Sequence, residues 1–262
     1  MRKILYFLVL LACPLMMVAQ DAANINNDVV NIPVSKVMGD SAYAKGNYGD
    51  AISVYENLLA NEGESFELYY NLGNAYYKAE NIAKSILAYE RALLLNPGDE
   101  DVVFNLELAR SKTVDKVSPT YKFFLVKWIE SIVNRASMQM WCVIGVAFFL
   151  LLLVLVLIFL FGKSIIMRKI SFFSALLCLF VTLFANFAAL HLYHNLTERT
   201  DAIVLQPSVT AKSTPSSSGT DLFVIHEGRK VKISDDSMQG WKEIKLEDGN
   251  IGWVPAESIE RI

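Results

Sequence analysis

The sequence has 262 residues, of which 53% are hydrophobic and only 19% are charged. Soluble domains carry about 25% charged residues, and the apolar excess lies in residues 136–162 and 170–197, which contain no Asp, Glu, Lys or Arg. The composition therefore predicts a membrane protein with soluble domains attached. The net charge of −3 excludes a dominant basic surface for nucleic acid. The three cysteines, Cys13, Cys142 and Cys178, lie in apolar stretches, which excludes a disulfide scaffold.

The N-terminus has the pattern of a secretory signal peptide. Arg2 and Lys3 precede an apolar run to residue 18, and small or polar residues follow it. Because this run is shorter than the roughly 20 residues that span a bilayer, we expect residues 1–19 to be cleaved and the chain after them to be exported. Lipidation of Cys13 is the alternative, since the preceding Leu-Leu-Ala resembles a lipobox.

Two later segments, residues 140–162 and 170–194, are each long enough to cross the bilayer. Neither has the polar stripe that a helix on the surface of a soluble domain needs. The connecting residues 162–169 include three bases, and the positive-inside rule places such a loop in the cytoplasm. Bases also flank the other ends of the spans, so the signal peptide decides the orientation. The sequence predicts a two-helix transmembrane hairpin with both soluble regions on the external face.

The juxtamembrane segment, residues 116–139, mixes aromatic and basic residues ahead of the first span. Residues 121–134 read YKFFLVKWIESIVN. This pattern is typical of an interfacial amphipathic helix whose aromatic rings lie at headgroup depth. A helix that packs on the neighbouring soluble domain is the alternative.

Residues 32–115 contain an internal repeat with a period of 34 residues. Four landmarks of the first copy, Gly39, Tyr43, Ile52 and Tyr55, recur in the second as Gly73, Tyr77, Ile86 and Tyr89. The small residues allow paired helices to approach, and the aromatic residues fill the space between them. This pattern resembles the tetratricopeptide (TPR) repeat. Asn71 recurs as Asn105, so we expect residues 101–112 to form a third first-helix that caps the array.

The resemblance to TPR repeats implies a concave groove. We expect this groove to bind a segment of a protein partner through Lys36, Asp40, Tyr43, Tyr70, Asn74, Tyr77, Phe104 and Leu108. In the alternative, the tyrosines pack between helices and the asparagines are solvated. Residues 21–115 carry 15 acidic and 7 basic residues, so any electrostatic steering favours a basic partner.

Residues 200–262 have the pattern of a small all-β domain, with residues 207–219 as a long loop. Five strand-like runs, at 202–205, 222–226, 230–233, 241–246 and 251–254, are separated by Gly-containing turns. The order of Glu-Gly, Gly-Trp, Asp-Gly and Gly-Trp landmarks at 227–228, 240–241, 248–249 and 252–253 resembles the bacterial SH3 (SH3b) domain. It implies an SH3-like barrel. Trp241 and Trp253 are candidates for a ligand groove, although we expect one of them in the core.

The sequence contains no pattern that indicates an enzyme or a metal site. His226 lies in a predicted strand, where we expect it at the surface. His191 and His194 share one helix face, but further metal ligands are absent nearby. Phosphate-loop, Ser/His/Asp and HExxH patterns are also absent. We therefore expect a non-enzymatic protein without a metal or other cofactor.

The order of signal peptide, TPR repeats, two membrane helices and SH3b domain resembles the BatE family of the bacterial aerotolerance (Bat) operon. The resemblance covers essentially the whole chain and rests on residues 72–77 (LGNAYY), 89–93 (YERAL), 104–108 (FNLEL), 223–227 (FVIHE) and 252–253 (GW). It implies an inner-membrane scaffold with periplasmic domains that works with other Bat proteins (von Willebrand A-type membrane proteins and a MoxR-type ATPase) in oxidative-stress tolerance. Two functions remain open: a scaffold for protein partners, and an envelope anchor that binds peptidoglycan through the SH3b domain.

Overall fold

The computed structural model describes residues 35–115 and 123–262. Ala136–His194 form one compact unit, and all other described residues form the second. The predicted signal peptide, with Cys13, lies outside the described residues, as does the beginning of the predicted juxtamembrane segment.

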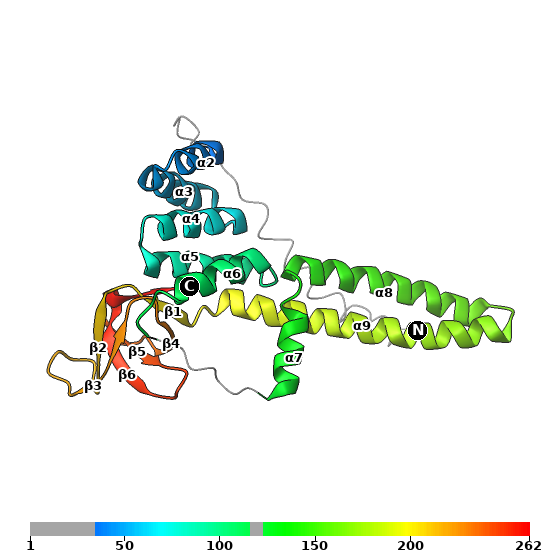
Figure 1. Ribbon diagram of the computed structural model, residues 1–262. Coiled ribbons are helices and arrows are strands. Elements are labelled where there is room, and N and C mark those ends of the chain that lie inside the picture. The colour runs from blue at the N-terminus through cyan, green and yellow to red at the C-terminus, as the bar shows by residue number, and fades with distance from the viewer. Residues whose placement is uncertain (1–34, 116–122) are drawn as a thin grey trace. The chain divides into compact units, whose positions relative to one another are not determined.

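Five helices stacked in chain order make up the first part of the second unit (Figure 1). They are α2 (Lys36–Ala44), α3 (Tyr48–Glu62), α4 (Phe66–Lys78), α5 (Ile82–Leu95) and α6 (Glu100–Arg110). The pairs α2–α3 and α4–α5 follow the two copies of the 34-residue period. α6 is the expected additional helix.

The repeated glycines explain why the two helices of each pair lie so close. A Cβ atom on Gly39 would lie 2.5 Å from Cε1 of Tyr55, and one on Gly73 would lie 2.5 Å from Cε1 of Tyr89. Both rings are almost fully buried. α6 carries the exposed Glu107 at the equivalent position. A long charged side chain there leaves no room for a closely packed partner helix, which accounts for the end of the array at α6.

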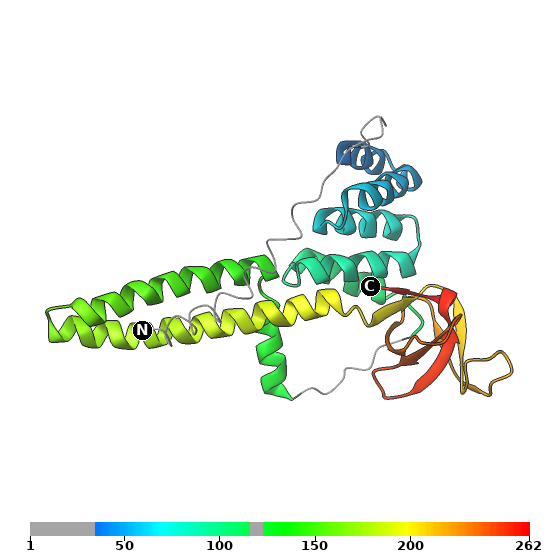
Figure 2. The same cartoon turned by 180° about the vertical axis from the view of Figure 1, so that it is seen from behind.

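The C-terminal part of the same unit is an antiparallel sheet, seen from both sides in Figures 1 and 2. Its strands are β1 (Asp201–Val204), β2 (Ser208–Lys212), β3 (Asp221–His226), β4 (Lys230–Asp235), β5 (Trp241–Lys245), β6 (Ile251–Pro255) and β7 (Ile259–Arg261). The order β3-β2-β6-β5-β4-β1-β7 leaves β3 and β7 as edges. The described sheet is therefore open, where we expected a closed barrel.

The number of strands also differs from the expected five. β2 lies inside the predicted loop, and β7 follows the short 3-10 helix Ala256–Ser258. Only Val209 and Ala211 of β2 point inward, and polar residues surround them, so the segment has the composition of a loop. The inward residues of the sheet form one buried cluster that includes Val209, Ala211, Ile225, Val231, Ile244 and Val254.

The other unit contains two apolar helices, α8 (Met138–Phe161) and α9 (Ile165–Thr197), which lie side by side in both views. Both are long and apolar enough to cross a membrane. α9 begins before the predicted residue 170, so the connection is shorter than expected. Inside α9, Thr182 Oγ1 donates to the Cys178 carbonyl (2.8 Å) and Asn186 Nδ2 donates to the Thr182 carbonyl (2.8 Å). These polar side chains are thus satisfied within their own helix.

A separate short helix, α7 (Phe124–Val133), precedes the apolar helices in the chain. Of its residues only Val133 is buried. Its C-terminal end contacts the α5–α6 turn, because a Cβ atom on Gly98 would lie 2.7 Å from the Asn134 carbonyl oxygen. The rest of α7 makes little contact within the described unit.

Candidate functional site: the groove of the helical array and its junction with the sheet

The polar side chains of the groove form a hydrogen-bond ladder that repeats with the sequence period. The Tyr55 hydroxyl donates to Asp40 Oδ1 (2.7 Å), and Asn71 Nδ2 donates to the same oxygen (3.2 Å). One period later the same bonds, at 2.7 and 3.1 Å, join Tyr89 and Asn105 to Asn74 Oδ1. The asparagines are therefore bonded to neighbouring helices, whereas the alternative interpretation had left them solvated.

The ladder tyrosines act as neutral hydrogen-bond donors. Burial, together with the hydrogen bond to Asp40, raises the pKa of Tyr55 well above its ordinary value. Burial likewise raises the pKa of Tyr89. A protonated phenol donates a hydrogen bond and is a poor nucleophile. Tyr55 and Tyr89 therefore hold neighbouring helices together. Their acceptors, Asp40 and Asn74, line the cavity of the groove.

A polar cavity of about 330 Å³ lies beside this ladder. Four of the predicted groove residues line it together with Tyr55 and Asn71; they are Lys36, Asp40, Tyr43 and Asn74. Lys36 Nζ lies 3.6 Å from Asp40 Oδ2 and 3.5 Å from Glu67 Oε2. The cavity thus presents one cation, one carboxylate, amides and a half-buried phenol, a set that can bind backbone and side-chain polar groups of a peptide.

The other four predicted residues do not line this cavity. The Tyr70 ring stacks on Phe66 at 6.4 Å, and Lys112 Nζ lies 4.2 Å from the centre of the Tyr77 ring. These contacts cover Tyr70 and Tyr77 in part. Phe104 and Leu108 are exposed on α6.

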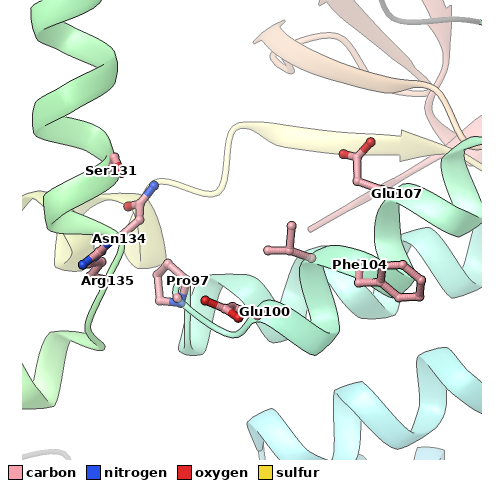
Figure 3. Close-up of a pocket in the computed structure, with 9 residues that line it drawn as sticks. Pro97, Glu100, Phe104, Glu107, Ser131, Asn134 and Arg135 are labelled. Carbon is pink, nitrogen blue, oxygen red and sulfur yellow. The ribbon is translucent and has the colours of Figure 1, made fainter.

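Phe104 lines a different cavity, of about 510 Å³, between α6 and the end of α7. Figure 3 shows Pro97 and Glu100 beside Asn134 and Arg135, with Phe104 farther along α6. Of the eight predicted groove residues, four therefore line the polar cavity and Phe104 lines the second cavity. Tyr70, Tyr77 and Leu108 line neither of these two cavities.

An ion-pair cluster around the buried Glu90 joins the helical array to the sheet. Glu90 on α5 accepts from Lys230 Nζ of β4 through Oε2 (3.0 Å) and from Arg110 of α6 through Oε1. Lys230 also pairs with Asp201 of β1 at 3.0 Å. Burial alone would lower the pKa of Lys230, but Glu90 and Asp201 together raise it above its ordinary value. Lys230 therefore keeps its charge, and its ion pairs with Glu90 and Asp201 hold the two parts together.

Apolar packing accompanies the ion pairs at this junction. Ile203 and Ile262 of the sheet belong to the same buried cluster as Ile86 and Leu87 of α5. The β3–β4 turn also fits closely against the array, since a Cβ atom on Gly228 would lie 2.9 Å from Ile86 Cδ1. The array and the sheet are thus parts of one folded unit.

His226 lies at this junction with about a third of its side chain exposed, and it has a partner there that the expectation of a surface histidine did not include. Its backbone N–H donates to Asp115 Oδ2, and its Nδ1 lies 2.8 Å from Asp115 Oδ1. Burial acts to raise the pKa of Asp115, but the hydrogen bonds from His226 outweigh it and leave that pKa below its ordinary value. This pair fixes the chain just after α6 to strand β3.

A bidentate ion pair also links the helical array, at the turn between α3 and α4, to the segment between α9 and β1. Arg199 Nη1 donates to Glu64 Oε1 (2.7 Å), and its Nη2 donates to the other carboxylate oxygen. Hydrogen bonding from Arg199 lowers the pKa of Glu64. Burial and the neighbouring Glu64 charge raise the pKa of Tyr69, whose hydroxyl donates to Glu64, to about 12.

Both tryptophans of the sheet lie on its outward face, so the expectation that one is in the core was wrong. Trp241 is paired with Pro255, and Trp253 with Glu243. Directly paired residues share a face, and the inward positions of these strands are Ile244 and Val254. Trp241 and Trp253 are half-buried and available on the same surface.

The junction could not be found from the sequence. Glu56 is the counterpart of Glu90 in the first repeat, yet it is exposed and accepts from the Tyr76 hydroxyl. Identical residue types at equivalent positions thus have different environments, because Glu90 lies within hydrogen-bond distance of Lys230 in the sheet whereas Glu56 is bonded to Tyr76. Within residues 35–115 and 123–262, no three His, Cys, Asp or Glu side chains are grouped so that they could hold a metal ion.

Paired helices with a polar concave cavity define an α-helical repeat region of the protein-interaction class. Residues 37–100, which include nearly all of α2 and the whole of α3, α4 and α5, match the family model of the tetratricopeptide repeat. No curated protein matches the sequence significantly.

Proposed function

We propose that the protein is a non-enzymatic, membrane-anchored scaffold that binds a protein partner in the groove of its TPR repeats. The observation that carries this proposal is the polar cavity beside the hydrogen-bond ladder. TPR repeats are interaction modules, and here Lys36, Tyr43 and Asn74 converge on one concave surface. The ladder holds Asn74 and Asp40 in place before a partner arrives, which reduces the entropy cost of binding.

The two apolar helices support the membrane anchor. At 1.5 Å per residue, the 24 residues of α8 extend about 36 Å, which exceeds the roughly 30 Å of a bilayer core. Gly145 is the one buried residue of α8. The other side chains of α8, which are almost all apolar, are therefore at least partly exposed in the fold. A helix surface of this kind is poorly soluble in water and is suited to contact with lipid.

The junction supports a topology with both soluble parts on one side of the membrane. Glu90 and Lys230 lie before and after the apolar helices in the sequence, yet they are bonded. Two spans return the chain to the side from which it started, and the predicted signal peptide makes that side external. The resemblance to the BatE family extends this proposal to a Bat-type complex in the bacterial inner membrane, with other Bat proteins as partners in oxidative-stress tolerance.

The outward tryptophans favour a second candidate function, that of a peptidoglycan-binding envelope anchor. Trp241 and Trp253 lie half-buried on the same outward face of the sheet, and SH3-type domains use aromatic residues of this kind for extended ligands. On this view the sheet domain, as an SH3b module, binds the wall and the repeats are accessory.

Site-specific photocrosslinking in cells tests the scaffold. A photoreactive amino acid replaces Tyr43 in the groove or, as the control, the exposed Asn57 on α3. We expect a discrete protein adduct from position 43 that disappears when Asn74→Ala is added, and none from position 57. Equal adducts from both positions, or none from position 43, would contradict groove binding.

Sedimentation with isolated peptidoglycan tests the second function. If the sheet is a wall anchor, Trp241→Ala with Trp253→Ala abolishes cosedimentation while the Tyr43 adduct persists. If wild-type protein does not cosediment, the anchor function is wrong. A reporter that requires export, fused after Ile262, tests the topology: it should be active, and activity of a cytoplasm-only reporter would contradict the external location.

A further inference from the structure

A cluster of exposed large apolar side chains outside α8 and α9 lies on α7. Phe124 is 67% exposed and Trp128 is 64% exposed, and Leu125, Val126 and Ile129 are also exposed. Large aromatic side chains seldom remain so exposed unless they meet another surface.

The apolar residues of α7 are gathered on one side of the helix. At 100° per residue, Phe124, Leu125, Trp128 and Ile129 cover one continuous arc, which we call the α7 apolar arc. The polar residues Lys127 and Glu130 lie on the other side, and Ser131 lies at the border of the arc beside Phe124. The apolar residues and the charged residues of this segment therefore lie on two different faces of one amphipathic helix.

The structure argues against the alternative that α7 packs its apolar face on the soluble domain. Contact with the helical array is made at the C-terminal end, where the carbonyl groups of Asn134 and Arg135 approach Gly98 and where Ser131, Asn134 and Arg135 line the second cavity. The α7 apolar arc is not part of the buried clusters of this unit. The array thus holds one end of α7 and leaves the arc uncovered.

We propose that the α7 apolar arc is a lipid-binding surface that lies in the headgroup region of the membrane. This inference rests on the proposed membrane anchor. α7 ends at Val133 and the first apolar helix begins at Met138, so the chain itself keeps α7 close to the bilayer surface. Its aromatic residues suit the interface, and residues 121–135 carry three bases and one acid, which favours anionic headgroups.

The consequence is a second attachment between the soluble unit and the membrane. The helical array is in close contact with one end of α7 at Gly98, so a helix that lies in the interface would restrain the array at a fixed depth. Such a restraint would present the groove to partners that are themselves in the membrane.

Lipid quenching of a site-specific fluorophore tests the proposal on the full chain. The native cysteines are replaced by alanine, and single cysteines are introduced as Leu125→Cys in the arc, Lys127→Cys on the polar side, or Leu151→Cys in α8. Each is labelled with an environment-sensitive dye. The proteins are reconstituted in vesicles of phosphatidylethanolamine and phosphatidylglycerol (3:1) that contain a lipid spin-labelled near the headgroup or in the mid-chain. Because interfacial helices bury their apolar face by about 5–10 Å, we expect roughly threefold stronger quenching by the shallow spin label at position 125 than at 127.

The label at position 151 distinguishes a failure of the α7 proposal from a failure of the proposed membrane anchor. If it is quenched by the mid-chain spin label while positions 125 and 127 are quenched equally weakly, the anchor holds and the α7 proposal is wrong. If the dye at 125 is shielded from water but is not quenched by lipid, a protein surface covers the arc, which also overturns the proposal. If the label at 151 is not quenched either, the membrane anchor itself is wrong.

Discussion

Removal of the Glu90 carboxylate is the most direct test of the junction between the helical array and the sheet. Glu90→Ala leaves Lys230 and Arg110 without their shared buried acceptor. Glu107→Ala is the matched control, because Glu107 bonds the same Arg110 at 3.1 Å but its side chain is 66% exposed, against 8% for Glu90. Both changes replace glutamate by alanine in a helix, so differences in helix propensity largely cancel.

The structure allows the loss in free energy of unfolding to be estimated for each of the two substitutions. Removal of one partner from a fully buried ion pair costs about 3–5 kcal/mol. Here Lys230 keeps Asp201 at 3.0 Å, Arg110 keeps Glu107, and both cations remain about a third exposed, so we expect about 2–3 kcal/mol for Glu90→Ala. For the exposed Glu107 the expected loss is about 0–1 kcal/mol.

Thermal unfolding of the full-length protein in detergent, followed by tryptophan fluorescence, measures the difference. For a folded unit of this size, 1 kcal/mol corresponds to about 2–4 °C in Tm, so Glu90→Ala should lower Tm by roughly 5–10 °C and Glu107→Ala by less than about 4 °C. Addition of Lys230→Met to Glu90→Ala should cost less than the sum of the two single changes. Equal losses for the two glutamates, or full additivity with Lys230→Met, would refute the ion-pair cluster around the buried Glu90.

Three further predictions concern single positions. Gly73→Ala should destabilise the array by about 1–3 kcal/mol because the new methyl overlaps a buried tyrosine ring, whereas Gly49→Ala, with nothing within 4 Å, should be neutral or stabilising in chemical denaturation. Gly228→Ala should cost more than Gly249→Ala, because both have positive φ but only the first would contact the array; equal unfolding midpoints would contradict this. The pKa of Asp115 is lowered in the folded state, so its ionised carboxylate stabilises the fold above the ordinary pKa of 3.8, and this contribution is lost as the pH falls through the folded-state pKa. Asp115→Asn should therefore make Tm fall less steeply as the pH is lowered in the acid range. An acid dependence of Tm equal to that of the wild type would refute this contribution.

The helical array was predictable because its causes are local and repeated. A glycine and a tyrosine 16 residues apart occur twice, as Gly39 with Tyr55 and Gly73 with Tyr89, and in each copy the glycine admits the ring. The same periodicity indicated the additional helix α6. The hydrogen-bond ladder also repeats with this period. The sequence did not show that Asp40 accepts hydrogen bonds from Tyr55 and Asn71, because an aspartate in a groove can equally well be hydrated.

The sheet and its contacts were less predictable for physical reasons. β2 alternates small apolar and polar residues and lacks the long apolar run that marks a buried strand. The outward position of Trp253 depends on register, since a shift by one residue would turn it inward. The pairing of Glu90 with Lys230 joins residues 140 positions apart, and no local pattern specifies such a partner.

The junction also bears on how the two candidate functions relate to each other. If the groove and the outward tryptophan surface belonged to independent domains, a partner bound at one would place no restraint on the other. Because the Glu90 cluster and the packing of Ile203 on α5 join both surfaces in one folded unit, a ligand held by the sheet would also restrict the orientation of the groove. Wall binding and partner binding are then compatible in a single molecule. A weakened junction, as in Glu90→Ala, should leave each isolated binding event intact while it removes their mutual restraint.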